Sequence, residues 1–126
     1  MFTTLLQVAL GGAIGASLRY SAGIMIVRSL GHNPFPVAII AVNVIGSFLM
    51  GVFVVAAAHR GLTYLSPFVM TGLLGGFTTF SAFSLEAVTL YERGDLGAAL
   101  LYVVMSVVFS ILGLVLGMML ARGFFA

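Results

Sequence analysis

The hydrophobicity of this chain rises and falls four times, and each apolar stretch is as long as a membrane span. A helix needs about 20 residues to cross roughly 30 Å of hydrocarbon. We place the four predicted spans near residues 4–27, 36–58, 66–91 and 97–121. The pattern therefore predicts an all-α integral membrane protein with four transmembrane helices, in which residues 1–126 form a single membrane domain.

Short polar or glycine-containing connections separate the predicted spans. Polar residues, glycine and proline commonly end apolar helices in this way. The three connections centre on Gly31-His32-Asn33-Pro34, His59-Arg60-Gly61 and Glu92-Arg93-Gly94-Asp95. Ser66 followed by Pro67 further predicts a helix N-cap with proline at the first helical position.

Composition excludes a soluble domain and several kinds of chemistry. Hydrophobic residues make up 62% of the 126 residues and charged residues only 6%, which is more apolar surface than a soluble domain of this size can bury. The chain has no cysteine, so disulfides and thiolate metal sites are excluded. The net charge of +2 is too small to predict binding of nucleic acid. The first apolar run lacks the basic region that precedes a cleaved signal peptide.

The third predicted span contains the most unusual sequence in the chain, GLLGGFTTFSAFSLE at residues 72–86. Glycines open this segment, hydroxyl residues follow them, and phenylalanines and one acid lie among these. Irregular backbone is tolerated at membrane depth only where protein or a water-filled cavity surrounds it. The segment therefore predicts a broken third helix that holds something at membrane depth.

The arginines near the ends of the predicted spans are shared equally between the two sides of the membrane. Arg60 and Arg122 lie on the side of both termini, whereas Arg28 and Arg93 lie on the opposite side. Two against two leaves almost no positive-inside bias. Either an early helix or the insertion machinery decides the orientation, or copies insert both ways and pair about a two-fold axis in the membrane plane. The second interpretation predicts an antiparallel, dual-topology homodimer.

Polar residues in the first two spans are candidates for a role beyond packing. Gly11 and Gly15 form a small-residue pair that permits close helix contact, and Arg19 continues the same face. An arginine at this depth usually faces protein or water, which suggests a vestibule charge, or it snorkels toward the interface. Asn43 in the second span either makes an interhelical hydrogen bond or lines a pore.

The fourth span carries hydroxyl groups along one face, because Tyr102, Ser106 and Ser110 are spaced at i, i+4 and i+8. Serine in a membrane helix also bonds to the carbonyl four residues before it, so the spacing is compatible with either a polar track or local bonding.

In the third span, Phe80 and Phe83 either fill space in the packing or turn their aromatic edges toward an anion.

Glu86 lies near the end of the third span, either at a pore mouth or at the membrane interface. The sequence lacks the residues that common catalytic sites need. It has no paired carboxylates at membrane depth and no HExxH, GxSxG or P-loop pattern. His32 and His59 lie in separate connections. The sequence therefore does not predict an enzyme.

The chain resembles the Fluc family of fluoride channels, also called CrcB proteins. Three segments carry the resemblance: GGAIGASLRY (11–20), NVIGSFLMG (43–51) and GLLGGFTTFSAFSLE (72–86). The resemblance covers essentially the whole chain, and the last segment is the most specific. One departure is Ala82, where the family often has threonine. The resemblance implies an antiparallel homodimer with two pores, in the bacterial plasma membrane, that allows passive fluoride efflux and so protects the cell.

The resemblance also implies roles for particular residues. A structural sodium ion would lie at the dimer centre, held by the backbone carbonyls of Gly75 and Thr78 from both subunits. Apart from the resemblance, the positions of Arg19 and Glu86 within their spans predict that both lie in vestibules. The fluoride path would include Asn43, Phe80, Ser81, Phe83, Tyr102, Ser106 and Ser110.

The residues support part of this picture without the family. Backbone carbonyls of unwound helices are hard oxygen ligands that suit sodium in membrane proteins, and neutral donors bind an anion weakly enough to release it. Two other classes remain open, a small dual-topology exporter of organic cations and a non-conducting membrane assembly subunit. A proton-coupled exporter needs a carboxylate at depth in an early helix, and the first span has none.

Overall fold

The computed structural model describes residues 1–31 and 35–125; the predicted turn residues His32, Asn33 and Pro34 lie outside the described residues. Those described are almost entirely helical, in keeping with the predicted all-α class. The elements in chain order are α1 (Phe2–Leu30), α2 (Val37–Arg60), η1 (Thr63–Leu65), η2 (Pro67–Leu74), α3 (Gly75–Phe77), α4 (Ser81–Glu92) and α5 (Leu96–Phe125).

Four helical stretches are long and apolar enough to cross a membrane, which confirms the four predicted spans. They cover Phe2–Leu30, Val37–Arg60, Thr63–Glu92 and Leu96–Phe125. Most stretches run a few residues past the predicted bounds. The protein is therefore a multi-pass membrane protein.

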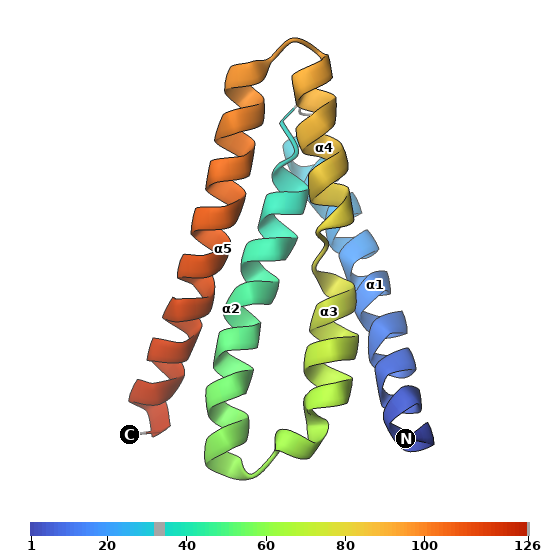
Figure 1. Ribbon diagram of the computed structural model, residues 1–126, viewed down its shortest axis with the longest axis vertical. Helices are drawn as coiled ribbons and strands as arrows, with labels where there is room; N and C mark the ends of the chain where they lie inside the picture. The colour runs from blue at the N-terminus through green and yellow to red at the C-terminus, as the bar shows by residue number, and fades with distance from the viewer. Residues whose placement is uncertain (32–34, 126) are drawn as a thin grey trace.

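The helices form an open arrangement rather than a closed bundle (Figure 1). Helix α5 packs along α2, and α1 packs along η2 and α3. Helix α4 contacts α5 instead, so the third span passes from one helix pair to the other between its two halves. Both termini lie at the same end of the molecule as the connection between α2 and the third span (Figure 1).

The described connections are short, and glycines with positive φ follow three of the helices, among them Gly31 after α1 with φ 76°. Gly61 follows α2 with φ 68°, and Gly94 follows α4 with φ 83°, a conformation that glycine adopts without steric cost. The predicted N-cap at Ser66 is wrong. Ser66 has helical dihedral angles and makes no capping hydrogen bond, because the short helix η1 already leads into η2. Pro67 does occupy the first position of η2, as predicted.

Helix α1 lies in direct backbone contact with the third span, and this confirms the small-residue contact predicted for Gly11 and Gly15. A Cβ atom at Gly15 would overlap the carbonyl oxygen of Leu73, and one at Gly11 would overlap that of Phe68. These atoms belong to the backbone and cannot move aside as a flexible side chain can. Glycine is therefore required for α1 to approach the third span this closely.

Aromatic contacts join the ends of α2 and α5 near the C-terminus. The ring of His59 stacks on Phe125 with 5.3 Å between centroids, and the guanidinium carbon of Arg60 lies 5.3 Å from the centre of the same ring. Cation–π contacts of this kind stabilise such pairs modestly. His59 thus packs against a helix end in the fold.

Candidate functional site

The candidate site is built around residues 78–80, which separate α3 from α4 within the third span. Thr78 is extended, with φ −84° and ψ 162°, and helical structure resumes at Ser81. Gly75 remains helical, with φ −62° and ψ −38°. The glycines therefore do not themselves depart from the helix. Gly76 instead permits close packing, because a Cβ atom there would lie 2.9 Å from the carbonyl oxygen of Gly12.

Asn43 of α2 binds the backbone of Thr79 through both ends of its side-chain amide. The Thr79 N–H donates to Asn43 Oδ1 at 2.7 Å, and Asn43 Nδ2 donates to the Thr79 carbonyl at 2.9 Å. Of the two interpretations of Asn43, the interhelical hydrogen bond is therefore present. Nδ2 carries a second hydrogen, and Asn43 also lines the cavity described below.

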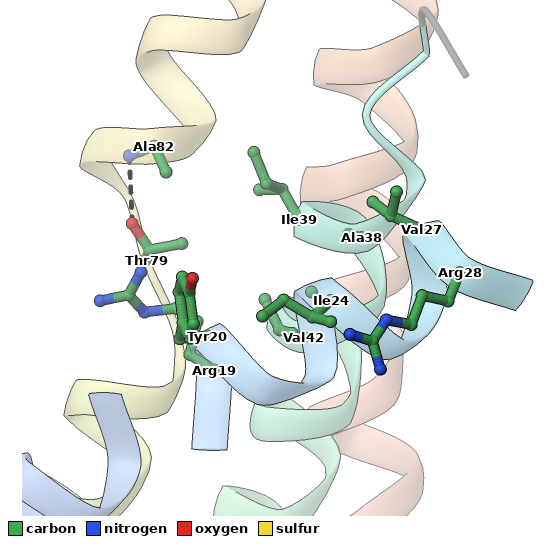
Figure 2. Close-up of a pocket in the computed structure, with 11 residues that line it drawn as sticks. Arg19, Tyr20, Ile24, Val27, Arg28, Ala38, Ile39, Val42, Thr79 and Ala82 are labelled. Atoms are coloured by element: carbon green, nitrogen blue, oxygen red, sulfur yellow. Dashed lines mark hydrogen bonds between the residues drawn. The ribbon is translucent and has the colours of Figure 1, made fainter. Parts of the chain in front are cut away.

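Thr79 also caps α4. Its Oγ1 accepts a hydrogen bond from the Ala82 N–H at 3.0 Å (Figure 2). An N-cap hydroxyl satisfies one of the first N–H groups of a helix in this way. The donor is the backbone of Ala82, so the missing threonine side chain at this position does not affect the bond. The sequence analysis did not predict this cap, although a threonine just before an apolar helical segment is a recognisable signal.

Several carbonyl groups around residues 78–80 already accept hydrogen bonds. Arg19 Nε donates to the Gly76 carbonyl at 3.1 Å. The Leu74 carbonyl accepts from both the N–H and the Oγ1 of Thr78. The Phe80 carbonyl accepts from both the N–H and the Oγ of Ser84. The carbonyls of Gly75, Phe77 and Thr78 accept none from the described residues. Unpaired carbonyls at membrane depth are costly, so these oxygens are available to a further partner.

A cavity of about 390 Å³ opens beside residues 78–80, between α2, α4 and α5. The predicted fluoride-path residues that line it are Asn43, Phe80, Phe83, Ser106 and Ser110. The structure therefore brings together five residues from three separate spans. Ser81 is exposed near this cavity and does not line it.

Tyr102 lies behind the cavity wall rather than in it. Its side chain is fully buried, with 0% exposure, and its ring centre lies 5.2 Å from that of Phe83. Phe83 in turn lies 5.4 Å from Phe80. The Tyr102 hydroxyl and Ser106 Oγ are both buried, and neither has a hydrogen-bond partner in the part of the chain that the structure describes. Two such hydroxyls are unusual, because buried polar groups are nearly always paired.

The two predicted vestibule residues do not share a cavity. Arg19 lines a second, mostly apolar cavity of about 490 Å³ between α1, α2 and the start of α4. Figure 2 shows Arg19 beside Thr79, with Arg28 at the other side of this cavity. Glu86 lies on α4 and lines neither cavity. Arg19 is not simply a snorkelling residue, because it is bonded to the Gly76 carbonyl.

Together, the fold and the site define a small four-span membrane protein with a partly polar cavity at membrane depth. A family model described as "CrcB-like protein, Camphor Resistance (CrcB)" matches residues 6–118, and the chain belongs to this family. The resemblance found in the sequence is thereby confirmed.

Several relatives are similar to this chain over nearly their whole length, and each bears the name "Fluoride-specific ion channel FluC". The protein of Ruegeria sp. (strain TM1040) is 66% identical over 123 residues, which cover 98% of each chain. That of Cereibacter sphaeroides (strain ATCC 17029 / ATH 2.4.9) is 60% identical over 126 residues and 100% of each chain. That of Agrobacterium fabrum (strain C58 / ATCC 33970) is 48% identical over 120 residues, 94% of this chain and 95% of the relative.

Proposed function

We propose that this protein is a fluoride-selective ion channel of the bacterial inner membrane, through which fluoride leaves the cell passively. Its relatives are named as fluoride-specific ion channels. The protein would protect the cell against fluoride and would catalyse no reaction. The observation within the chain that carries the proposal is the pair of buried hydroxyls, on Tyr102 and Ser106, which have no partner among the described residues.

The chemistry of fluoride explains why unpaired hydroxyls matter. Fluoride is small and strongly hydrated, so a path through the membrane must replace its water with hydrogen-bond donors. Tyr102, Ser106 and Ser110 supply neutral donors on one helix, and these bind an anion weakly enough to let it leave. The positive edges of the Phe80 and Phe83 rings add attraction without a charge.

Helix dipoles favour two different ions on the two sides of residues 78–80. The N-terminus of α4 at Ser81 carries a partial positive charge, and the end of α3 at Phe77 carries a partial negative charge. An anion is favoured beside Phe80, on the α4 side, and a cation beside the carbonyls on the α3 side. The interruption of the third helix would thus create a binding position for an anion at one helix end and for a cation at the other.

A structural sodium ion fits the oxygen atoms on the α3 side. The carbonyls of Gly75 and Thr78 accept no hydrogen bond from the described residues, and carbonyls of interrupted helices are suitable sodium ligands in membrane proteins. In the proposed channel these two carbonyls hold the ion, which supplies positive charge that offsets the unpaired oxygens.

An antiparallel homodimer would cover groups that a single copy leaves open. Gly75 and Ser81 are exposed at membrane depth, and Phe80 is 77% exposed beside them. Polar backbone and hydroxyl groups facing hydrocarbon are unfavourable, whereas a second copy around the same segment would bury them. Equal numbers of arginines at the two ends of the molecule fit insertion in both orientations.

Purified protein in liposomes loaded with potassium fluoride is expected to release fluoride when valinomycin balances the charge. A fluoride electrode measures the efflux, and vesicles loaded with potassium chloride provide the matched control. Fluoride efflux should exceed chloride efflux by at least about a hundredfold if the site selects by hydration and donor geometry. Equal efflux of the two anions, or none of fluoride, would refute the proposed function.

A tag at the C-terminus is expected to be reachable from both faces of the membrane in nearly equal amounts. The reason is the balanced arginine distribution, which gives insertion no preferred direction. Labelling with an impermeant reagent, before and after permeabilisation of cells, measures the two populations. Adding two lysines after Phe125 should shift the population toward one orientation, whereas labelling of the unmodified chain from one face alone would contradict dual topology.

A further inference from the structure

We propose that the side chains of Asn43 and Thr79 are positioning residues that keep the Gly75 and Thr78 carbonyls free for a cation. This inference rests on the proposed function, because it concerns the sodium site of that channel. Neither side chain needs to touch the ion. Each acts by taking away a backbone N–H group that would otherwise occupy one of the two carbonyls.

The hydrogen-bond register of an α-helix shows which N–H groups these are. In an uninterrupted helix, each carbonyl accepts from the N–H four residues later. Gly75 would therefore accept from Thr79, and Thr78 would accept from Ala82. In the structure, the Thr79 N–H donates to Asn43 Oδ1 at 2.7 Å, and the Ala82 N–H donates to Thr79 Oγ1 at 3.0 Å. Both natural donors are thus diverted to side chains.

Most neighbouring carbonyls, unlike those of Gly75 and Thr78, accept a hydrogen bond from the described residues. Leu74 accepts from Thr78, Gly76 accepts from Arg19, and Thr79 accepts from Asn43. Phe77 is the remaining carbonyl without a hydrogen bond from the described residues. The polar side chains of α1 and α2 therefore satisfy the carbonyls of Gly76 and Thr79, whereas those of Gly75 and Thr78, like that of Phe77, are left without a donor from the described residues.

Energetics favour this arrangement only if another partner reaches the two carbonyls. Asn43 satisfies both polar groups of the Thr79 backbone, which removes a large cost at membrane depth. The cost of the unpaired Gly75 and Thr78 carbonyls remains, and a cation would offset it. Without the two side chains, the segment can recover helical hydrogen bonds at these carbonyls, and binding an ion would first require breaking them.

The test compares Asn43→Ala and Thr79→Val with Thr79→Ser and Val55→Ala. Thr79→Val keeps the shape of the side chain and removes the hydroxyl, whereas Thr79→Ser keeps the hydroxyl. Val55 is buried on α2, away from residues 78–80, and its truncation controls for general loss of packing. The melting temperature of each purified protein is measured across a series of sodium concentrations at constant ionic strength, with N-methylglucamine as the replacement ion.

Asn43→Ala and Thr79→Val are expected to raise the sodium concentration for half-maximal stabilisation by about tenfold or more, because a hydrogen bond must be broken before the ion binds. Thr79→Ser should stay close to the original protein. Val55→Ala should melt at a lower temperature with unchanged sodium dependence. Fluoride efflux from liposomes provides the second readout and should show the same shift in sodium dependence.

Two results would overturn the inference. One is a sodium dependence in Thr79→Val and Asn43→Ala that matches the original protein, as expected if these residues only pack or only contact fluoride. The other is an original protein whose melting temperature does not respond to sodium, since there is then no ion to position. Fluoride efflux of the original protein tests the proposed channel separately, so failure of the inference and failure of the channel are distinguishable.

Discussion

Gly15→Ala is expected to destabilise the folded protein by about 3 kcal/mol, the upper end for overpacking, because the three atoms nearest to the added Cβ all belong to the backbone. The new Cβ would overlap the Leu73 carbonyl oxygen and lie 2.9 Å from the Phe77 backbone nitrogen. Helix α1 must then move away from the third span. That movement also pulls Arg19 away from the Gly76 carbonyl, to which it donates at 3.1 Å.

Gly12→Ala provides the matched control for this prediction, three residues away on the same helix. A Cβ atom at Gly12 has no neighbour within 4 Å, and alanine is a better helix former than glycine by about 1 kcal/mol. Gly12→Ala should therefore be as stable as the original protein or slightly more stable. Thermal unfolding in detergent, followed by size-exclusion chromatography, measures both variants. Equal stability of the two would show that α1 does not pack as described.

Phenylalanine at position 102 is expected to make the protein more stable and a poorer channel. The hydroxyl of Tyr102 is buried without a partner among the described residues, and removal of such a group stabilises a fold by about 1 kcal/mol. The ring remains, with its contacts to Phe83 and Phe35. Loss of the donor should lower fluoride efflux by about tenfold, because fluoride then passes with one fewer partner in place of water.

Ser106→Ala should act in the same direction, and the double variant should lose more efflux than either single one. Ser17→Ala provides the control, because Ser17 Oγ donates only to the Ala13 carbonyl of its own helix, at 2.7 Å, on an exposed face. Melting temperature and the liposome efflux assay measure the two properties separately. A Tyr102→Phe protein that is more stable and conducts fluoride normally would show that this hydroxyl is not part of the path.

If these groups bind ions as proposed, stability and function are opposed at this site for a physical reason. A hydroxyl that already donates a hydrogen bond within the fold cannot donate the same hydrogen to a passing ion. A buried hydroxyl without a partner can do so, but it lowers the stability of the fold when no ion is bound. The same opposition applies to the Gly75 and Thr78 carbonyls. Unpaired groups at membrane depth therefore mark the places where we expect ions.

Sequence reasoning identified the residues of the candidate site more reliably than their arrangement. The hydroxyl spacing of α5 and the phenylalanines of α4 pointed to the cavity that Phe80, Phe83, Ser106 and Ser110 line. Spacing placed Tyr102 on the same helix face as Ser106 and Ser110, but only the structure shows that its ring is buried against Phe83. The helical repeat predicts on which face of its helix a side chain lies, but it does not predict how close a neighbouring helix comes to that side chain.

The sequence by itself determined the class of protein, the four spans and the small-residue pair of α1. These are local properties, because the length of an apolar run, measured against the thickness of the hydrocarbon, decides whether it crosses. Tertiary structure alone decided that Asn43 binds Thr79, 36 residues away, and that Arg19 binds Gly76, 57 residues away. It also decided that Ser66 caps nothing. Hydrogen bonds depend on which helix faces meet, and that is settled only when all four spans pack together.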